Sequence, residues 1–171
     1  MERTIRRAIP ADAEMLNQLA ARTFYDTFAS SNTPENMQAY MSAVFNLREI
    51  ERELADPRSK FLIAEVGGEP AGYAKLYEGE IPECVTGPDP IEIVRLYVEQ
   101  RWLGSGVGRA LMQTCLDEAR QSGHRTIYLG VWEQNHRALA FYRKWGFEIV
   151  GSHVLMVGDD PQNDWWMERR L

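Results

Sequence analysis

The sequence predicts an α+β fold, in which one mixed β-sheet is combined with helices. Apolar residues repeat at helical spacing in some segments and alternate with polar residues in others. A turn-rich tetrapeptide joins two strand-like runs, and a glycine-rich segment links a strand-like run to a helical one. A chain of 171 residues with 44% hydrophobic residues can bury one sizeable core, so we expect residues 1–171 to form a single domain.

The first third of the chain is expected to form one strand and three helices. Asp12 is a candidate N-cap for the first helix. Thr33 before Pro34 is typical of a helix start, because threonine caps the helix and proline suits its first turn. The expected ranges are residues 4–9 for the strand and residues 11–28, 34–45 and 47–54 for the helices.

Residues 61–66 and 71–77 read as two antiparallel strands, because the intervening Gly67-Gly68-Glu69-Pro70 suits a hairpin turn. Residues 80–90 contain three prolines and one glycine and are expected to form a loop. Residues 91–98 return to strand. Strict alternation would place Glu92, Val94, Leu96 and Val98 on one face of this strand, and Ile93, Arg95 and Tyr97 on the other.

A helix is expected to open at residues 104–108 and to end at Gly123, because apolar residues recur at every fourth position between them. Alternation predicts a strand at residues 127–132. A further helix is expected at residues 135–145, closed by Gly146, and two last strands near residues 147–157 and 164–170.

The composition argues against several classes of partner. A net charge of -6 does not suit nucleic-acid binding and fits a cationic small substrate better. No apolar run is long enough for a membrane span or a signal peptide, so we expect a cytoplasmic protein without a membrane partner. The two cysteines suggest neither a disulfide nor a zinc site, and the three histidines lack ligand spacing, so no metal is expected.

The segment from Arg101 to Arg109 is a candidate anion site. It joins a strand to a helix, so backbone N–H groups at the helix N-terminus favour a phosphate, and its glycines permit close approach. The Gly-Lys-Ser/Thr of a P-loop is absent, and the glycines fall as G-x-G-x-G, not the G-x-x-G ending of a dinucleotide-binding turn. A glycine-rich turn without any ligand is the alternative.

Two side chains nearby suit acid and base chemistry. Glu92 lies six residues before Val98, about 20 Å along the strand, where a ligand arm leaving the anion site would end. Asn135, Ala138 and Tyr142 share one helix face. The alternatives are a solvated carboxylate at Glu92, a plain N-cap at Asn135 and a packing aromatic at Tyr142.

Arg101-x-x-Gly104-x-Gly106, followed by Asn135-x-x-Ala138-x-x-Phe141-Tyr142-x-x-x-Gly146-Phe147, resembles the motifs of GNAT superfamily N-acetyltransferases. The resemblance implies a mostly antiparallel central sheet with helices on both faces, acetyl-CoA as cosubstrate, and Tyr142 as the acid that reprotonates the CoA thiolate. The positions implied for acetyl-CoA binding are Leu96, Tyr97, Val98, Arg101, Gly104, Ser105, Gly106, Val107, Gly108, Arg109, Asn135 and Ala138.

Two more segments are similar to PaiA-type spermidine/spermine acetyltransferases: Asn32-Thr33-Pro34-Glu35-Asn36-Met37, and a tail of Gly151-Ser152-His153 with Gly158-Asp159-Asp160-x-Gln162-x-Asp164. The implied acceptor is a polyamine, with Glu92 as the general base, directly or through water, and residues near Tyr25 and Asp26 holding the rest of the cation. The alternatives are another amine, such as a protein N-terminus, an antibiotic or an amino acid, and a non-catalytic CoA-binding regulatory module. A homodimer is possible.

Overall fold

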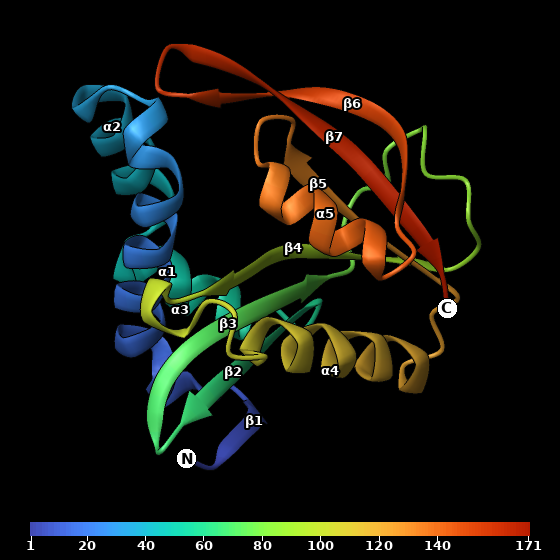
Figure 1. The fold of residues 1–171 in the computed structure, drawn as a ribbon, viewed down its shortest axis with the longest axis horizontal. Coiled ribbons are helices and arrows are strands. Elements are labelled where there is room, and N and C mark those ends of the chain that lie inside the picture. The colour runs from blue at the N-terminus through green and yellow to red at the C-terminus, as the bar shows by residue number, and fades with distance from the viewer.

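The strand-like runs form one seven-stranded sheet in the computed structural model, which describes residues 1–171 (Figure 1). The strands are β1 (Arg3–Arg7), β2 (Ser59–Val66), β3 (Glu69–Tyr77), β4 (Pro90–Val98), β5 (Thr126–Trp132), β6 (Glu148–Val157) and β7 (Asp160–Arg170). Their order is β1-β2-β3-β4-β5-β7-β6, and only β4 and β5 run parallel. The mixed, mostly antiparallel sheet is thus confirmed.

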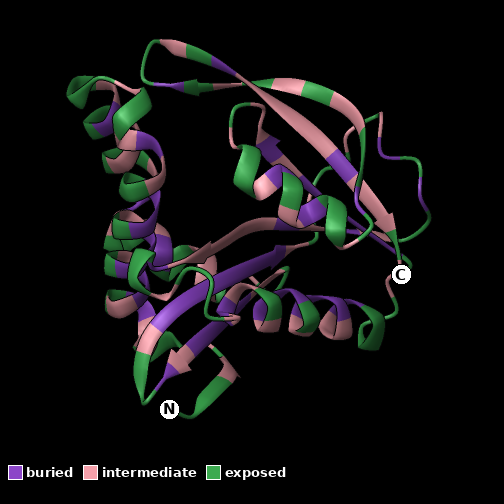
Figure 2. Ribbon diagram, in the orientation of Figure 1, coloured by how far each residue is buried: buried purple, intermediate pink, exposed green.

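Helices cover both faces of this sheet (Figure 1). They are α1 (Ala13–Phe28), α2 (Pro34–Val44), α3 (Leu47–Ala55), α4 (Val107–Gln121) and α5 (His136–Lys144), with single 3₁₀ turns at Pro10–Asp12, Ala29–Ser31 and Gln100–Trp102. One apolar core joins α4 and α5 to the sheet, and a second joins α1, α2 and α3 to its other face. Figure 2 shows the buried residues concentrated in the central strands and on the inward sides of the helices. No helix combines the length and apolarity needed to cross a bilayer.

Helix starts follow the sequence except at α1. Thr33 caps α2 as expected, its hydroxyl accepting the Asn36 N–H at 3.1 Å. Asp12 occupies the N-cap position of α1 as expected, but its side chain makes no capping hydrogen bond to that helix. Its carboxylate instead pairs with both terminal nitrogens of Arg6 at 2.9 Å and accepts the Ile9 N–H at 2.8 Å. The chain therefore begins this region with a 3₁₀ turn before α1.

A β-bulge in β4 overturns the expected alternation of its side chains. Lys75 of β3 lies opposite Arg95, but the next residue, Leu76, lies opposite Ile93, so β4 carries one extra residue. Such a bulge reverses which face the following side chains occupy. Glu92 therefore shares a face with Arg95, and not with Leu96 and Val98 as alternation predicted.

The parallel strands β4 and β5 separate along their length. Their pairing ends at Ile93 opposite Leu129, although the strands continue to Val98 and Trp132. The edge of β4 from residue 94 onward that faces β5 is thus left without a strand partner, while its other edge remains paired with β3. Figure 1 shows the two strands diverging from each other in the middle of the sheet.

Candidate active site

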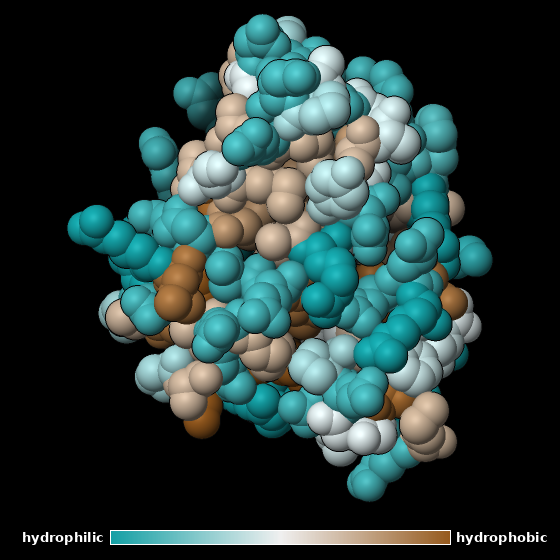
Figure 3. Space-filling view, turned by 90° about the vertical axis from the view of Figure 1, so that its left-hand side faces the viewer, coloured by the Kyte–Doolittle hydropathy of each residue, from teal (hydrophilic) through white to brown (hydrophobic).

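A cavity of about 760 Å³ lies where β4 and β5 separate. Its walls come from α1, α2, β4, the start of α4, the end of β5, α5 and the final hairpin. Eleven of the residues expected to act in binding or catalysis line it: Glu92, Leu96, Tyr97, Val98, Gly104, Gly106, Gly108, Arg109, Asn135, Ala138 and Tyr142. The outer surface on the α1 and α2 side is hydrophilic over much of its area, with a moderately apolar area in the upper half of the view and smaller apolar spots below it (Figure 3).

The turn before α4 has the backbone shape of an anion cradle. Gly104 and Gly106 have φ of 79° and 89°, a left-handed conformation that glycine adopts without a steric cost. Gly106 is the N-cap of α4, so the N–H groups of the first turn behind it have no partner within the helix. The indole N–H of Trp102, which also lines the cavity, is buried without an acceptor. Unpaired donors at a helix N-terminus fit a phosphate group.

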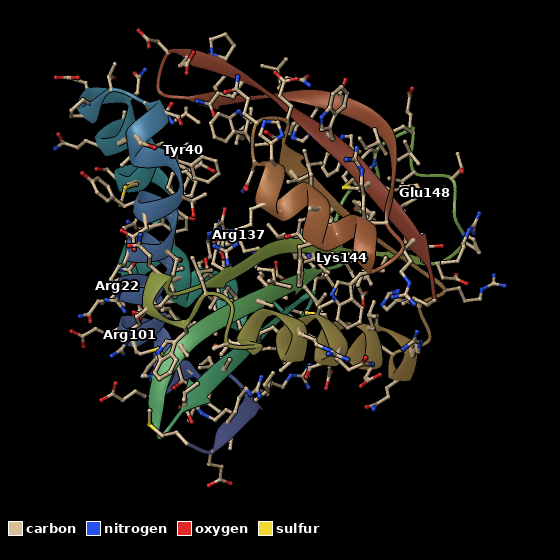
Figure 4. The ribbon with its side chains drawn as sticks, in the orientation of Figure 1. Arg22, Tyr40, Arg101, Arg137, Lys144 and Glu148 are labelled. Atoms are coloured by element: carbon tan, nitrogen blue, oxygen red, sulfur yellow. The ribbon has the colours of Figure 1, made fainter.

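Two arginines add positive charge to this part of the cavity. Arg109 in the first turn of α4 and Arg137 in the first turn of α5 both line it. Neither guanidinium forms an ion pair with a side chain of this protein. Figure 4 shows Arg137 in the central space between α5 and β4. Both are therefore available to anionic groups of a ligand.

Three positions expected to bind the ligand point their side chains elsewhere. The guanidinium of Arg101 pairs with Glu99 and Glu69, both at 3.0 Å, beside Arg22 of α1, which also pairs with Glu99 (Figure 4). Ser105 donates its hydroxyl to the carbonyl of Trp102 at 2.5 Å. The side chain of Val107 is buried in the core. A ligand contact from these three positions would have to come from the backbone.

Asn135 is the N-cap of α5, as expected. Its side-chain oxygen accepts the N–H of Ala138 at 3.2 Å, which leaves its amide NH₂ free toward the cavity that both residues line. The unpaired edge of β4 passes through the same cavity. A strand edge offers alternating N–H and C=O groups to an extended, amide-containing ligand.

Glu92 is a half-buried carboxylate without a hydrogen-bonded partner. Burial raises its pKa to about 6, and the nearby charge of Lys75 counteracts part of that rise. Lys75 itself donates a hydrogen bond of 3.0 Å to the carboxylate of Glu53. Glu53 also accepts two hydrogen bonds from Arg95, of 2.9 and 3.0 Å. Glu92 is therefore ionised near neutral pH and more basic than an ordinary glutamate, as a general base requires.

Tyr142 presents a hydroxyl that makes no hydrogen bond within the protein. Its ring packs edge-on against Phe141 and Phe147, with centroids 5.5 and 5.8 Å away. Burial raises the pKa of this hydroxyl above its ordinary value, so the proton is retained at neutral pH. A protonated, unpaired hydroxyl lining the cavity suits a general acid.

Aromatic rings and Asp26 form the wall contributed by the N-terminal helices. Phe24 stacks on Tyr40 with centroids 4.8 Å apart, and Phe28 packs against Trp132 at 5.5 Å. Asp26 lines the cavity as expected, but Tyr25 is 53% exposed and faces a smaller hollow between α1 and α2. Only Asp26 of this pair is placed to meet a ligand in the main cavity.

The final hairpin bridges the cavity and rests on α2 (Figure 1). Asp159 at its turn donates its N–H to Asn36 at 3.3 Å, and the Gln162 amide donates to Asn32 at 2.6 Å. The two segments that resemble the PaiA group therefore contact each other across 123 and 130 residues of sequence. The last strand begins at Asp160 because this bridge extends the hairpin beyond its expected start at residue 164.

The hairpin also brings His153 and Asp164 into the cavity. Both residues belong to the tail motif, but the sequence does not indicate a role for either. Nor does it identify Arg137 as a site residue, although Arg137 lies two positions after the predicted helix cap Asn135. Their convergence depends on strand pairing that no local pattern specifies. No cluster of His, Cys, Asp and Glu side chains suitable for a metal ion is found anywhere in the molecule.

The comparisons with known proteins agree on one family. The profile of the acetyltransferase (GNAT) family matches residues 14–147. An uncharacterized N-acetyltransferase of Lactobacillus delbrueckii subsp. lactis is 33% identical over 153 residues, covering 90% of this chain and 88% of that protein. The N-alpha-acetyltransferase RimI of Mycobacterium tuberculosis is 33% identical over 149 residues, covering 86% and 80%. The structure of PaiA N-acetyltransferase from Thermoplasma acidophilum, in complex with coenzyme A, superposes with a TM-score of 0.82 at 20% identity over both whole chains.

Proposed function

The chain belongs to the acetyltransferase (GNAT) family and is an acetyl-CoA-dependent N-acetyltransferase, and we propose that its acceptor is a primary amine, most specifically a polyamine such as spermidine or spermine. Bound acetyl-CoA supplies the thioester whose acetyl group is transferred. The remaining question is which side chains of this protein bind the two substrates and move the protons.

The proposed binding residues for acetyl-CoA follow from the cavity. The N–H groups at the start of α4, from Gly104 to Arg109, would hold the pyrophosphate, and Arg109 and Arg137 would add charge-assisted bonds. The free edge of β4 from Leu96 to Val98 would pair with the amides of the pantetheine arm, and Asn135 would bind it from the α5 side.

Glu92 is the proposed general base. An alkylamine with a pKa near 10.4 is protonated at neutral pH, and releasing its proton costs about 4 to 5 kcal/mol at pH 7. The carboxylate of Glu92, directly or through one water, accepts that proton and so exposes the nitrogen lone pair. The nitrogen then bonds to the thioester carbon, and the carbon–sulfur bond breaks as the adduct nitrogen loses a second proton. That proton replaces, through water, the one that Tyr142 gives to the sulfur, and Glu92 releases its own proton to solvent.

Tyr142 is the proposed general acid. Its hydroxyl donates a proton to the sulfur as the carbon–sulfur bond breaks, which returns coenzyme A as a thiol. Burial raises the pKa of Tyr142, and burial of the departing sulfur would raise the pKa of its thiol in the same way. Because both values rise, the tyrosine can still protonate the thiolate. Tyr142 would then act only on the chemical step, without contributing to the binding of acetyl-CoA.

The observation that carries the polyamine proposal is the acidic and aromatic lining of the acceptor end of the cavity. The final hairpin is joined to Asn32 and Asn36 at this end. Carboxylates and aromatic faces, from Asp26 and Tyr40 among others, suit a flexible cation. The likeness in fold to the PaiA structure accords with this proposal.

The second candidate acceptor is a protein N-terminus. It is favoured by the 33% identity to a protein named N-alpha-acetyltransferase RimI. A peptide terminus brings one charge at its amino group, whereas the cavity offers carboxylates at Glu92, Asp26 and Asp164, which suits an acceptor with several positive charges better.

The test is thiol release from acetyl-CoA with a panel of acceptors. The panel contains spermidine, spermine, an amino acid, an aminoglycoside and a peptide with a free N-terminus. We expect rapid release with the polyamines, accompanied by acetylated product. Release only with the other acceptors would contradict the polyamine proposal while leaving the family activity intact.

We further propose that residues 1–171 act as one domain in the cytoplasm. If the protein dimerises, β6 is the strand to test, because it is an edge of the sheet and exposes Val154 and Met156.

A further inference from the structure

Asp164 is a partly buried carboxylate that the catalytic proposal leaves unused. Its Oδ1 is shielded from solvent and has no hydrogen-bond partner. The nearest ionisable nitrogen belongs to His153, whose Nε2 lies 3.8 Å from Oδ2, beyond hydrogen-bond range, while the Nδ1 of this histidine is also buried and unpaired. A buried carboxylate without a partner is costly, so a group that binds it in a ligand complex would remove that cost.

The sheet places Asp164 and Glu92 on the same face and some distance apart. Asp164 is opposite Trp132 in the β5–β7 pair, and Glu92 is opposite Tyr128 in the β4–β5 pair. Tyr128 and Trp132 are four residues apart on β5, so they share a face and are separated by about 13 Å. Both carboxylates also line the same cavity. A molecule that meets both must be elongated.

The surroundings of Asp164 suit an ammonium group. Trp166 stacks on His153 with centroids 4.2 Å apart, and Trp132 contributes a second indole to the cavity wall. Aromatic faces attract cations, and burial lowers the pKa of His153, so its ring is uncharged at neutral pH and does not compete for Asp164. Of the three arginines that line the cavity, Arg95 is held by Glu53 through two bonds, and Arg109 and Arg137 lie at the starts of α4 and α5.

We propose that Asp164, assisted by the neutral ring of His153, binds a second ammonium group of the acceptor while its reacting nitrogen lies near Glu92. Asp164 is thus a specificity residue that selects diamines and polyamines over monoamines. This inference rests on the proposed amine acetylation and adds to it the residue that binds the second ammonium group of the acceptor.

The test compares two acceptors of similar length, 1,7-diaminoheptane and 7-amino-1-heptanol, which differ in one terminal ammonium group and are elongated enough to approach both carboxylates. The Asp164→Asn variant removes the charge with little change of shape. Its kcat/KM for the diamine is expected to fall by about thirtyfold or more, the usual effect of removing one partner from a buried charge pair. Its kcat/KM for the amino alcohol should stay within about threefold of the wild type, since that acceptor makes no charge pair at this position.

Two further variants separate this role from general effects. Glu148→Gln removes a carboxylate from the same hairpin but outside the cavity and away from the contacts with α2, and should leave both acceptors unaffected. Asp164→Glu keeps the charge and should retain a preference for the diamine. An equal loss of kcat/KM for both acceptors in Asp164→Asn, or no loss for either, would overturn the assignment.

A binding measurement keeps this inference distinct from the proposed function. Spermidine is titrated by calorimetry into the coenzyme A complex of the wild type and of Asp164→Asn. Binding that is weakened by the variant, without any acetylation of polyamines, would support the cation site and refute polyamine acetylation. Binding and acetylation that are both unchanged in the variant would refute the site and leave the proposed function standing.

Discussion

Replacing Glu92 with glutamine tests the proposed base directly. The amide has nearly the same size, cannot accept the proton, and leaves the Lys75–Glu53–Arg95 ion pairs unchanged. An amine of pKa 10.4 is neutral in only about one molecule in 2,500 at pH 7, and the variant must rely on that fraction. We expect kcat/KM at pH 7 to fall by about 100- to 1,000-fold, as is typical for loss of a general base.

The dependence of kcat/KM on pH tests the role of Glu92 more specifically than the loss of activity at a single pH. The pKa of Glu92 is raised to about 6 by burial, so the wild-type kcat/KM should fall tenfold per pH unit below about pH 6, where the carboxylate takes up a proton. Burial likewise raises the pKa of Asp164 to about 6, so the assay uses 7-amino-1-heptanol, which has no second ammonium group. Lys75 and Tyr128 also lie near Glu92; burial lowers the pKa of Lys75 and raises that of Tyr128 from their ordinary values.

In Glu92→Gln the acidic limb at pH 6 should be absent, and kcat/KM should instead rise about tenfold per pH unit from pH 7 toward 9 as free amine accumulates. The matched control is Glu83→Gln, which removes an exposed carboxylate outside the cavity. Wild-type kcat/KM in Glu92→Gln at pH 7, or a wild-type profile that is flat down to pH 5, would refute Glu92 as the base.

Three other substitutions test the acid, the cradle and the core. Tyr142→Phe should lower kcat by about 100-fold or more with a nearly unchanged KM for acetyl-CoA, measured by thiol release at saturating amine; a raised KM with normal kcat would argue for a binding role instead. Gly106→Ala, at a φ of 89°, should weaken acetyl-CoA binding and lower stability by about 1 kcal/mol or more, seen by calorimetry and thermal melting; unchanged affinity would count against the cradle. Glu53→Ala leaves Lys75 and Arg95 buried without their shared partner and should cost about 3 to 5 kcal/mol in urea unfolding, and a loss below 1 kcal/mol would show that water reaches these cations.

Local patterns predicted most of the fold. The strand and helix ranges agree with the structure to within a few residues at most ends, because alternation, helical spacing and glycine stops are properties of short segments. The bulge in β4 could not be predicted in this way, because it depends on how β3 pairs with β4. The residues around Val94 therefore do not indicate that the side chain of Glu92 lies on the opposite face from the one that alternation predicts.

The site likewise contains residues that local motifs predict and residues that only the folded chain brings together. The glycines of the cradle and the cap at Asn135 belong to local motifs, and the structure brings them to one cavity. The side chain of Arg101 points away because Glu99 and Glu69 compete for it, which only the packed chain reveals. Asp164 reaches the cavity through strand pairing with β5 and through hairpin contacts to residues more than 120 positions away.

The central claim is that this acetyltransferase acts on a polyamine rather than on a protein terminus. A competition experiment measures this directly: acetyl-CoA, spermidine and an equimolar peptide with a free N-terminus are incubated together with the wild-type protein, and the products are identified by mass spectrometry. The account predicts that acetylspermidine accumulates first and in large excess, because only the polyamine places charges at both Glu92 and Asp164. Preferential acetylation of the peptide would contradict it.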